Sequence, residues 1–195
     1  MSRTAVVVQA RVGSTRLPGK VLQALRGKTV LAHALARCAA IPGIDSVVCA
    51  TSDLPADDAI LAEAQQAGAE VFRGSQDDVL ARYLGAAESV GAEVVLRVTS
   101  DCPLIDPAIC RAVLDLRESA VADYASNNMP RLFPHGLDCE AFTTAALRKA
   151  SVTTAVPFDR EHVTPWLRRA AGLKRANLPG PGWPASMHRW TLDYP

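Results

Sequence analysis

The chain lacks a surplus of charge of either sign, because its 195 residues carry 21 Lys and Arg against 20 Asp and Glu, a formal net charge of +1. Binding along a nucleic-acid backbone depends on many cations on one face, so this balance argues against a general nucleic-acid binder. The sequence also lacks an apolar run of membrane-spanning length, and its first residues lack the apolar segment and cleavage site of a signal peptide. Neither a nucleic acid nor a membrane is an expected partner.

Cysteine pairs and linkers are missing as well. The five cysteines show no C-x-x-C spacing, and the four histidines show no zinc-ligand spacing. An odd number of cysteines cannot all pair within the chain, so we expect reduced thiols and a cytoplasmic protein. No Ser/Gly-rich linker divides the sequence and 49% of its residues are apolar, so residues 1–195 are expected to form one domain.

A cationic loop is the most informative feature that is present. The β-branched run 6–8 predicts a buried strand, and the segment after it carries three cations, two hydroxyls and two glycines. Glycines let backbone N–H groups approach a phosphate closely, hydroxyls donate hydrogen bonds, and cations neutralise charge. We therefore predict a polyphosphate-binding loop whose cations reach into solvent. Its predicted nucleotide-binding residues are Gln9, Ala10, Arg11, Gly13, Ser14, Arg16 and Lys20.

Two well-known phosphate-binding loops do not match this segment. In a P-loop, four residues separate the glycines, and the second glycine precedes Lys and then Ser or Thr. Here five residues separate Gly13 from Gly19, and Val21 follows Lys20. The dinucleotide-binding pattern G-x-G-x-x-G is absent after this strand. The loop therefore belongs to neither class.

Predicted strands and helices alternate along much of the chain. Short apolar segments followed by turn or polar residues predict strands at 4–10, 46–51, 70–72 and 94–99. Helical spacing of apolar residues predicts helices at 30–40, 57–67 and 77–90, one starting near 107, and others near 144–150 and 161–171. This order predicts an α/β fold: a Rossmann-like, mostly parallel sheet with helices on both faces, and a small excursion after about residue 123.

Polar residues stand at or just after several of these strands. Thr51, Arg73, Ser100 and Asp101 are in such positions. Ligands of open parallel sheets bind beyond the carboxyl ends of the strands, so these residues are expected to gather with the loop at one edge. Arg97 lies within an apolar strand, where an unpaired cation is costly, so we expect it to meet a carboxylate or the ligand.

Asp101 is the second feature of the sequence that suggests a chemical role. It follows the apolar strand, and Pro103 prevents a helix from starting beside it. A helix-capping role is the alternative, but Asp106 stands directly before Pro107 and suits that role better. A triphosphate beside three cations still needs Mg²⁺ to organise its oxygens, so Asp101 is predicted to bind Mg²⁺.

The string QARVGSTRLPGKVL at 9–22 closely resembles the opening signature of the cytidylyltransferase family. That family includes the CMP-Kdo synthetases, the acylneuraminate cytidylyltransferases and the spore coat polysaccharide biosynthesis protein F (SpsF) group, which is nearest in wording. Further similar segments follow in the family's order over the whole chain, at 71–75 with 78–80, 97–107, 123–127, 136–140, 160–164 and 189–193.

The resemblance implies a fold, a reaction and partners. The fold is that of the nucleotide-diphospho-sugar transferases, and the reaction transfers CMP from CTP to a sugar, often an acidic one, with release of pyrophosphate. It would serve surface or spore coat polysaccharide biosynthesis, in a homodimer formed through the excursion. The implied catalytic residues are Arg11, Arg16, Lys20 and Asp101, and Asp193 matches a second aspartate that binds Mg²⁺.

Base and acceptor recognition fall less clearly on particular residues. Arg73 is expected to contact the cytosine carbonyl or a phosphate, whereas Ser75 and Asp78 suit a helix cap. Arg97, Thr51 and Ser100 complete the predicted nucleotide-binding set. The candidates for the acceptor pocket, each with turn-capping as an open alternative, are Asn127, His135, Asp138 and Glu140. His162 is open to packing or pairing.

Three other functions remain open. Enzymes of this fold that use UTP or GTP with sugar phosphates need additional cations for the acceptor, and the region offers mainly Arg131, Arg160 and His135. A glycosyltransferase using a nucleotide sugar typically carries Asp-x-Asp, but segment 101–103 has one carboxylate. A non-catalytic module would lack the loop cations or Asp101. The chain stops at 195, where the family usually continues through an acidic residue into another helix, so we expect either a short gene product or a trimmed C-terminus.

Overall fold

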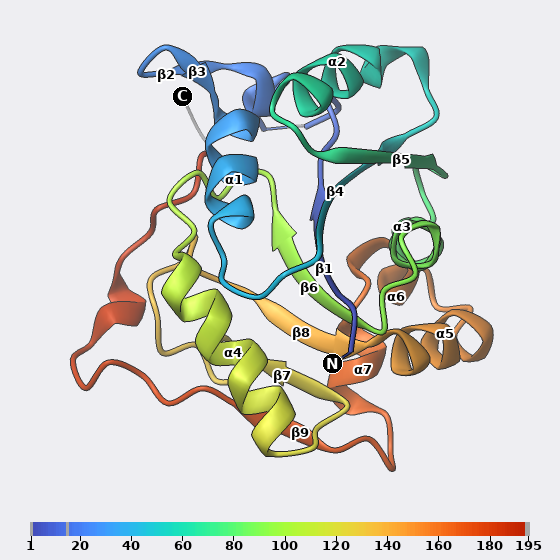
Figure 1. Cartoon of the computed structure of the whole chain (residues 1–195), viewed down its shortest axis with the longest axis vertical. Helices are drawn as coiled ribbons and strands as arrows, with labels where there is room; N and C mark the ends of the chain where they lie inside the picture. Colours follow the sequence, from blue (N-terminus) through green and yellow to red (C-terminus); the bar gives the residue numbers. More distant parts are fainter. Residues whose placement is uncertain (1, 15, 194–195) are drawn as a thin grey trace.

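The valines that predict the first strand lie at the centre of the protein and have no exposed surface. The computed structural model describes residues 2–14 and 16–193. Their strand, β1, is flanked on both sides by parallel strands in a seven-stranded sheet of order β5-β4-β1-β6-β8-β7-β9 (Figure 1). The strands are β1 (Thr4–Gln9), β4 (Ser46–Ser52), β5 (Glu70–Gly74), β6 (Val94–Thr99), β7 (Tyr124–Ser126), β8 (Glu140–Thr143) and β9 (Arg175–Asn177).

The predicted mostly parallel sheet is confirmed. The four strands expected from the sequence are β1, β4, β5 and β6, and all of them run parallel. Three short strands extend the sheet beyond β6: β8 pairs antiparallel with β6 and β7, and β9 pairs parallel with β7. These three strands form the excursion expected after about residue 123. A small hairpin, β2 (Ala24–Leu25) with β3 (Lys28–Thr29), follows the cationic loop.

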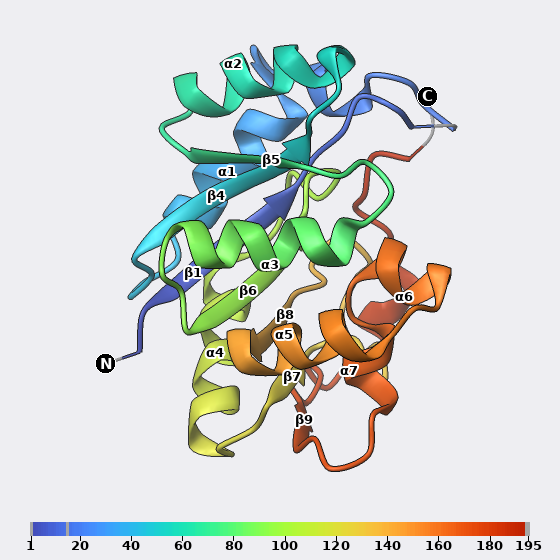
Figure 2. The same ribbon diagram turned by 90° about the vertical axis from the view of Figure 1, so that its right-hand side faces the viewer.

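Helices cover both faces of the sheet, as expected. On one face, α1, α2 and α4 pack against the side chains of Val6, Val8 and Leu96. On the other, α3 and α5 pack against Val7 and Val95, and Figure 2 shows α3 lying across β1 and β6. The helices are α1 (Val30–Ala39), α2 (Asp58–Gln66), α3 (Val79–Ser89), α4 (Pro107–Ser119), α5 (Thr144–Thr153), α6 (Pro157–His162) and α7 (Pro165–Arg169). Within the described residues, no helix is long and apolar enough to span a membrane.

The prediction of one helix at 161–171 is wrong, because two short helices occupy this region. α6 ends at His162, and the next residue, Val163, has a φ of 70°, which is unusual for a β-branched residue. Pro165 then begins α7. The predicted caps are confirmed: Asp106 accepts the N–H groups of Ala108 and Ile109 at 2.8 and 3.1 Å.

A buried carboxylate joins the added strands to the parallel part of the sheet. Glu140 of β8 is 1% exposed, accepts from Arg97 Nη1 at 2.6 Å and from Arg168 Nε at 3.0 Å, and also accepts from Tyr124 Oη. The expectation that Arg97 meets a carboxylate is confirmed. Its other hydrogen bond reaches Gln9 Oε1 at 3.1 Å. The structure therefore makes Glu140 part of the core rather than an exposed acceptor ligand.

The first prediction concerns this buried cluster. Glu140→Gln keeps the side chain's size but leaves Arg97 and Arg168 without their carboxylate, so the free energy of unfolding should fall by about 3 kcal/mol. Glu88→Gln is the matched control, because Glu88 pairs with Arg148 on the surface; there the loss should stay below about 1 kcal/mol. Urea denaturation at neutral pH measures both, and equal losses would contradict the assignment.

The same cluster predicts a dependence on pH. Burial tends to raise the pKa of Glu140, but the charges of Arg97 and Arg168 outweigh it and lower the pKa from 4.5 to about 2. The stability that this group contributes is therefore complete above about pH 4.5 and is lost as the pH falls toward 2. The difference in unfolding free energy between wild type and Glu140→Gln should shrink over that interval, and a constant difference would refute the pairing.

Candidate active site

A cavity of about 310 Å³ opens at the carboxyl ends of β1 and β6. The chain passes from β1 to β4 and β5 on one side and returns with β6 on the other, so the strand order reverses between these two strands. Such a reversal point is where open α/β sheets bind ligands. The strand ends supply Gln9 and Ala10 from β1, and Thr99, Ser100 and Asp101 from β6. The expected gathering of loop and strand-end residues is thus present for these positions.

The cationic loop is held at its start by Asp57, which lies shortly after β4. The N–H of Val12 donates to Asp57 Oδ1 at 2.8 Å, and the N–H of Gly19 donates to the carbonyl of Val12 at 3.0 Å. Gly19 has φ of 68°, which glycine adopts without steric cost. Asp57 is 3% exposed and also accepts from Ser52 N at 3.3 Å. Asp57 thereby fixes the loop beside β4.

Lys20 lies between the two predicted metal-binding carboxylates. Its Nζ donates to Asp101 Oδ2 and to Asp193 Oδ1, each at 2.8 Å. Lys20 is only 9% exposed, so the expectation of a solvent-reaching lysine is wrong. Its ion pairs with the two carboxylates hold the ammonium group inside the protein. Arg16 remains on the outside, with its side chain 54% exposed, and donates to Asp193 Oδ1 at 3.1 Å.

These contacts change the ionisation of all three groups. Burial disfavours the charged form of each, but the pairing outweighs it: the pKa of Lys20 is raised, and the pKa values of Asp101 and Asp193 are lowered. Asp193 also accepts from Thr191 Oγ1 at 3.0 Å and pairs with Arg189. Both carboxylates are therefore ionised at neutral pH.

The segment carrying Asp193 is tied to the rest of the site by its backbone. The N–H of Leu192 donates to the carbonyl of Asp101 at 3.0 Å, and the N–H of Trp190 donates to the carbonyl of His135 at 2.6 Å. Gly136 allows this close approach, because a Cβ there would lie 2.7 Å from the Trp190 carbonyl carbon. Asp193 is 4% exposed as a result. The structure thus brings it to Asp101.

The carboxylates of Asp101 and Asp193 fit Mg²⁺. Their oxygens converge on one cation, the Lys20 ammonium. Nucleotide-dependent enzymes commonly bind Mg²⁺ through one or two carboxylates, completed by substrate phosphates and waters. Within residues 2–14 and 16–193, no group of 3 or more His, Cys, Asp or Glu side chains could hold a metal. This pair would therefore need phosphate oxygens to complete its coordination.

Four predicted nucleotide-binding residues do not line the cavity: Gly13, Thr51, Arg73 and Arg97. Arg73 donates to the carbonyls of Ser52 and Leu54 at 3.0 and 2.9 Å and to Asp58 at 2.7 Å, so it ties down the segment after β4. Thr51 has no exposed surface. Neither side chain lines the cavity, and Arg97 lies beneath it with Glu140.

The predicted acceptor residues are divided between core and surface. Asn127 is fully buried, and its side chain donates to the Leu137 carbonyl at 2.7 Å and accepts from Cys139 N at 3.0 Å. Asp138 pairs with Arg131 at 2.6 Å. His135 Nδ1 lies 3.0 Å from Arg189 Nη1 and so adjoins the residues around Asp193. Burial, and then the charge of Arg131, lowers the pKa of His135. Of the four candidates, His135 and Asp138 lie on the side of Asp193.

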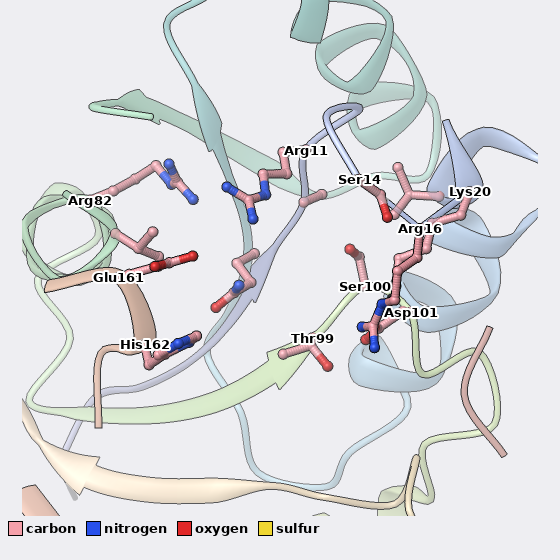
Figure 3. A pocket seen from close by; sticks show the side chains of 14 residues that line it. Arg11, Ser14, Arg16, Lys20, Arg82, Thr99, Ser100, Asp101, Glu161 and His162 are labelled. Carbon is pink, nitrogen blue, oxygen red and sulfur yellow. The ribbon is translucent and has the colours of Figure 1, made fainter. Parts of the chain in front are cut away.

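Three ionisable cavity residues were missing from the predicted site: Arg82 from α3, and Glu161 and His162 from α6 (Figure 3). Arg82 stands on an apolar helix face between Val79 and Tyr83, and a cation in such a position is the signal that could have identified it. Asp57 was predicted only as the start of a helix. Its contact with Val12 spans 45 residues and has no local signal.

Several known proteins resemble this chain. The family model described as cytidylyltransferase matches residues 5–180. Spore coat polysaccharide biosynthesis protein SpsF of Bacillus subtilis is 35% identical over 201 residues, which cover 99% of this chain and 82% of SpsF. The 3-deoxy-manno-octulosonate cytidylyltransferase of Aeromonas salmonicida is 38% identical over 134 residues, so the match covers 64% of this chain and spans only 50% of that enzyme. A cytidylyltransferase structure from Leptospira borgpetersenii has a TM-score of 0.93 at 33% identity, over 99% of this chain and 82% of that one.

The second prediction tests the position of Lys20. Lys20→Ala leaves the buried Asp193 and the partly buried Asp101 without the ammonium between them, so the free energy of unfolding should fall by about 3 kcal/mol. Arg16→Ala serves as the matched control, because it removes a more exposed partner of Asp193 and should cost less than about 1 kcal/mol. Urea denaturation at pH 7 measures both variants. Similar losses of unfolding free energy in the two variants would show that Lys20 is not the main cation that neutralises Asp101 and Asp193.

Proposed function

This chain belongs to the cytidylyltransferase family, and we propose that it transfers CMP from CTP to a sugar acceptor with release of pyrophosphate. The observation that carries the proposal is the contact of Lys20 with both Asp101 and Asp193 at the reversal point of the sheet. A cationic loop, a pair of ionised carboxylates and a cavity beside the strand ends are the parts that transfer of a nucleotidyl group requires.

The mechanism follows from the charges of these residues. Arg11, Arg16 and Lys20 would bind the triphosphate and stabilise the negative charge of the leaving pyrophosphate. An acceptor hydroxyl attacks the α-phosphorus in line, so its new P–O bond forms as the bond to the β-phosphate oxygen breaks. Asp101 and Asp193 would hold Mg²⁺, which supplies Lewis-acid polarisation of phosphate oxygens. The protein contributes mainly positioning and electrostatic stabilisation.

We further propose that the acceptor is an acidic sugar. Arg131, His135 and Arg189 lie near Asp193 and would favour an anionic acceptor. The name of SpsF, spore coat polysaccharide biosynthesis protein, supports a role in making a polysaccharide. The five cysteines are all buried and free, which supports the cytoplasm as the compartment.

A homodimer is part of the same proposal. Trp183, Met187 and Trp190 are 49%, 83% and 41% exposed, and these large apolar side chains come from one short segment after β9. Exposed apolar surface of this kind is typical of protein interfaces. We propose that a second copy of the chain covers it.

The third prediction concerns the nucleotide. CTP with Mg²⁺ should raise the melting temperature more than ATP, GTP or UTP, because a ligand that binds the native state stabilises it by about 2.7 kcal/mol at 100 times its Kd. For a chain of this size, the shift is roughly 5–10 °C. A pyrophosphate-release screen of the four nucleotides with acidic sugars and sugar phosphates then identifies the acceptor. Equal shifts with all four nucleotides would reject cytidine selectivity, and turnover with UTP or GTP and a sugar phosphate would indicate the other class.

The fourth prediction separates catalysis from scaffolding at Asp101. Asp101→Asn retains size but removes the anionic oxygen that Mg²⁺ prefers, so kcat should fall by at least about a hundredfold while CTP binding largely survives. Asp106→Asn is the matched control, because Asp106 only caps α4 and Asn caps equally well. Near-wild-type turnover of Asp101→Asn at saturating CTP and Mg²⁺ would eliminate Asp101 as a metal ligand.

A further inference from the structure

Asp57 stands at the start of α2 but does not cap that helix. At the N-cap position an aspartate usually accepts N–H groups of the first helical turn, yet the Asp57 side chain accepts none from α2. Its oxygens turn elsewhere: Oδ1 accepts from Val12 N at 2.8 Å, and Oδ2 accepts from Ser52 N at 3.3 Å and from the Ser52 hydroxyl. A helix-capping role therefore does not account for this carboxylate.

The carboxylate of Asp57 is also buried without a cation in contact with it. Within the described residues it forms no ion pair, and its hydrogen-bond donors are the groups of Val12 and Ser52. The neighbouring Asp58 shows the more usual arrangement, because it is exposed and pairs with Arg73 at 2.7 Å. A buried charge lowers stability unless other groups compensate it. The contact with Val12 is thus one of the few that hold Asp57 in place, and it reaches the cationic loop.

Val12 is the residue at which the cationic loop folds back on itself. Its carbonyl accepts from the N–H groups of Ser14 and Gly19 at 2.8 and 3.0 Å, while its own N–H is held by Asp57. Arg11 directly precedes Val12, and Ser14 follows it by two positions. Both Arg11 and Ser14 line the cavity (Figure 3). The position of Val12 therefore determines where these two side chains stand.

We infer that Asp57 is a positioning residue for the triphosphate: by holding the N–H of Val12, it places Arg11 and Ser14 for phosphate binding before the nucleotide arrives. This inference rests on the proposed function, in which the cationic loop binds the triphosphate of CTP. A loop that is already ordered loses less conformational freedom when it binds its ligand, and its affinity is higher for that reason.

A counter-ion role for Asp57 predicts the opposite effect on binding. Figure 3 shows the guanidinium groups of Arg11 and Arg82 directed toward each other across the cavity. Burial is the largest cause that lowers the pKa of Arg82; the charge of Arg11 lowers it further, and the charge of Asp57 raises it. If Asp57 served only to offset this positive charge, its removal would strengthen CTP binding. The geometry favours positioning, because the oxygens of Asp57 contact Val12 and Ser52 rather than either arginine.

The experiment measures the Kd of CTP, with Mg²⁺ and without any acceptor, by isothermal titration calorimetry. Asp57→Ala removes both the charge and the acceptor for the Val12 N–H, so CTP should bind about tenfold more weakly. Asp57→Asn removes the charge but keeps an oxygen for Val12, so its Kd should stay within about threefold of the wild-type value. Asp58→Ala is the matched control, because Asp58 lies in the first turn of the same helix and pairs with Arg73. Its Kd should be unchanged.

Two further measurements separate the position of the loop from the stability of the fold. Asp57→Ser has a side chain too short to reach Val12, but serine caps helices well, so this variant should bind CTP as weakly as Asp57→Ala while α2 gains a cap. Hydrogen exchange in the nucleotide-free protein, followed by NMR, should be at least about tenfold faster at the Val12 amide in Asp57→Ala and Asp57→Ser than in wild type. The amides of β1 should keep their wild-type rates.

Each result decides for or against the inference. CTP binding by Asp57→Ala and Asp57→Ser that equals or exceeds wild type overturns it and makes Asp57 a counter-ion. Equal weakening by Asp57→Asn and Asp57→Ala also overturns it, because the oxygen that Val12 needs is retained in the former. Faster exchange throughout β1 assigns Asp57 to the stability of the fold instead. Wild type that does not bind CTP contradicts the proposed function, and the inference falls with it.

Discussion

The site depends on one buried ammonium. Lys20 Nζ holds Asp101 and Asp193, each at 2.8 Å, and thereby joins the cationic loop, the turn after β6 and the C-terminal segment. Two ionised carboxylates this close together at a partly buried site would repel each other. A cation between them offsets that repulsion. Mg²⁺ would suit the same two carboxylates. With phosphate oxygens as its other ligands, it would supply the positive charge that the Lys20 ammonium supplies when no nucleotide is bound. On the proposed function, stability and chemistry would therefore use the same groups.

The fold beneath the cavity supplies rigidity through a separate charge cluster. Glu140 receives Arg97 and Arg168, and Arg97 also donates to Gln9 at 3.1 Å, which lines the cavity. Gln9 is thus held from below by a network that is itself fixed among three strands and α7. Above it, the ion pair between Arg160 and Asp78 fixes α6 to α3. The cavity therefore lies between two sets of ion pairs: the Glu140 cluster in the sheet, and the pair of Arg160 and Asp78 between α6 and α3.

The sequence predicted the parallel part of the sheet because those strands alternate with helices, and each has a local signal. It missed β7, β8 and β9, which have 3 or 4 residues each and no periodicity to detect. The prediction that residues following strands gather at the cavity is right for Asp101 and wrong for Arg73. The Arg73 guanidinium donates instead to backbone carbonyls of the segment after β4. Arg82 was missed and Glu140 was assigned to the acceptor pocket for one reason. Tertiary partners decide whether a charged side chain is part of a site or of the core, and local sequence does not show them.

The contact between Lys20 and Asp193 joins residues 173 positions apart. A contact of such separation closes a long loop, whose entropy must be offset before the contact adds to stability. The segment that carries Asp193 is tied to the site chiefly by backbone hydrogen bonds at Leu192 and Trp190, without a strand or an α-helix of its own there. Local detachment of that segment would leave the sheet and its two cores folded. A molecule in that state retains the fold but holds only one of its two carboxylates beside Lys20, so activity and folding can be lost separately.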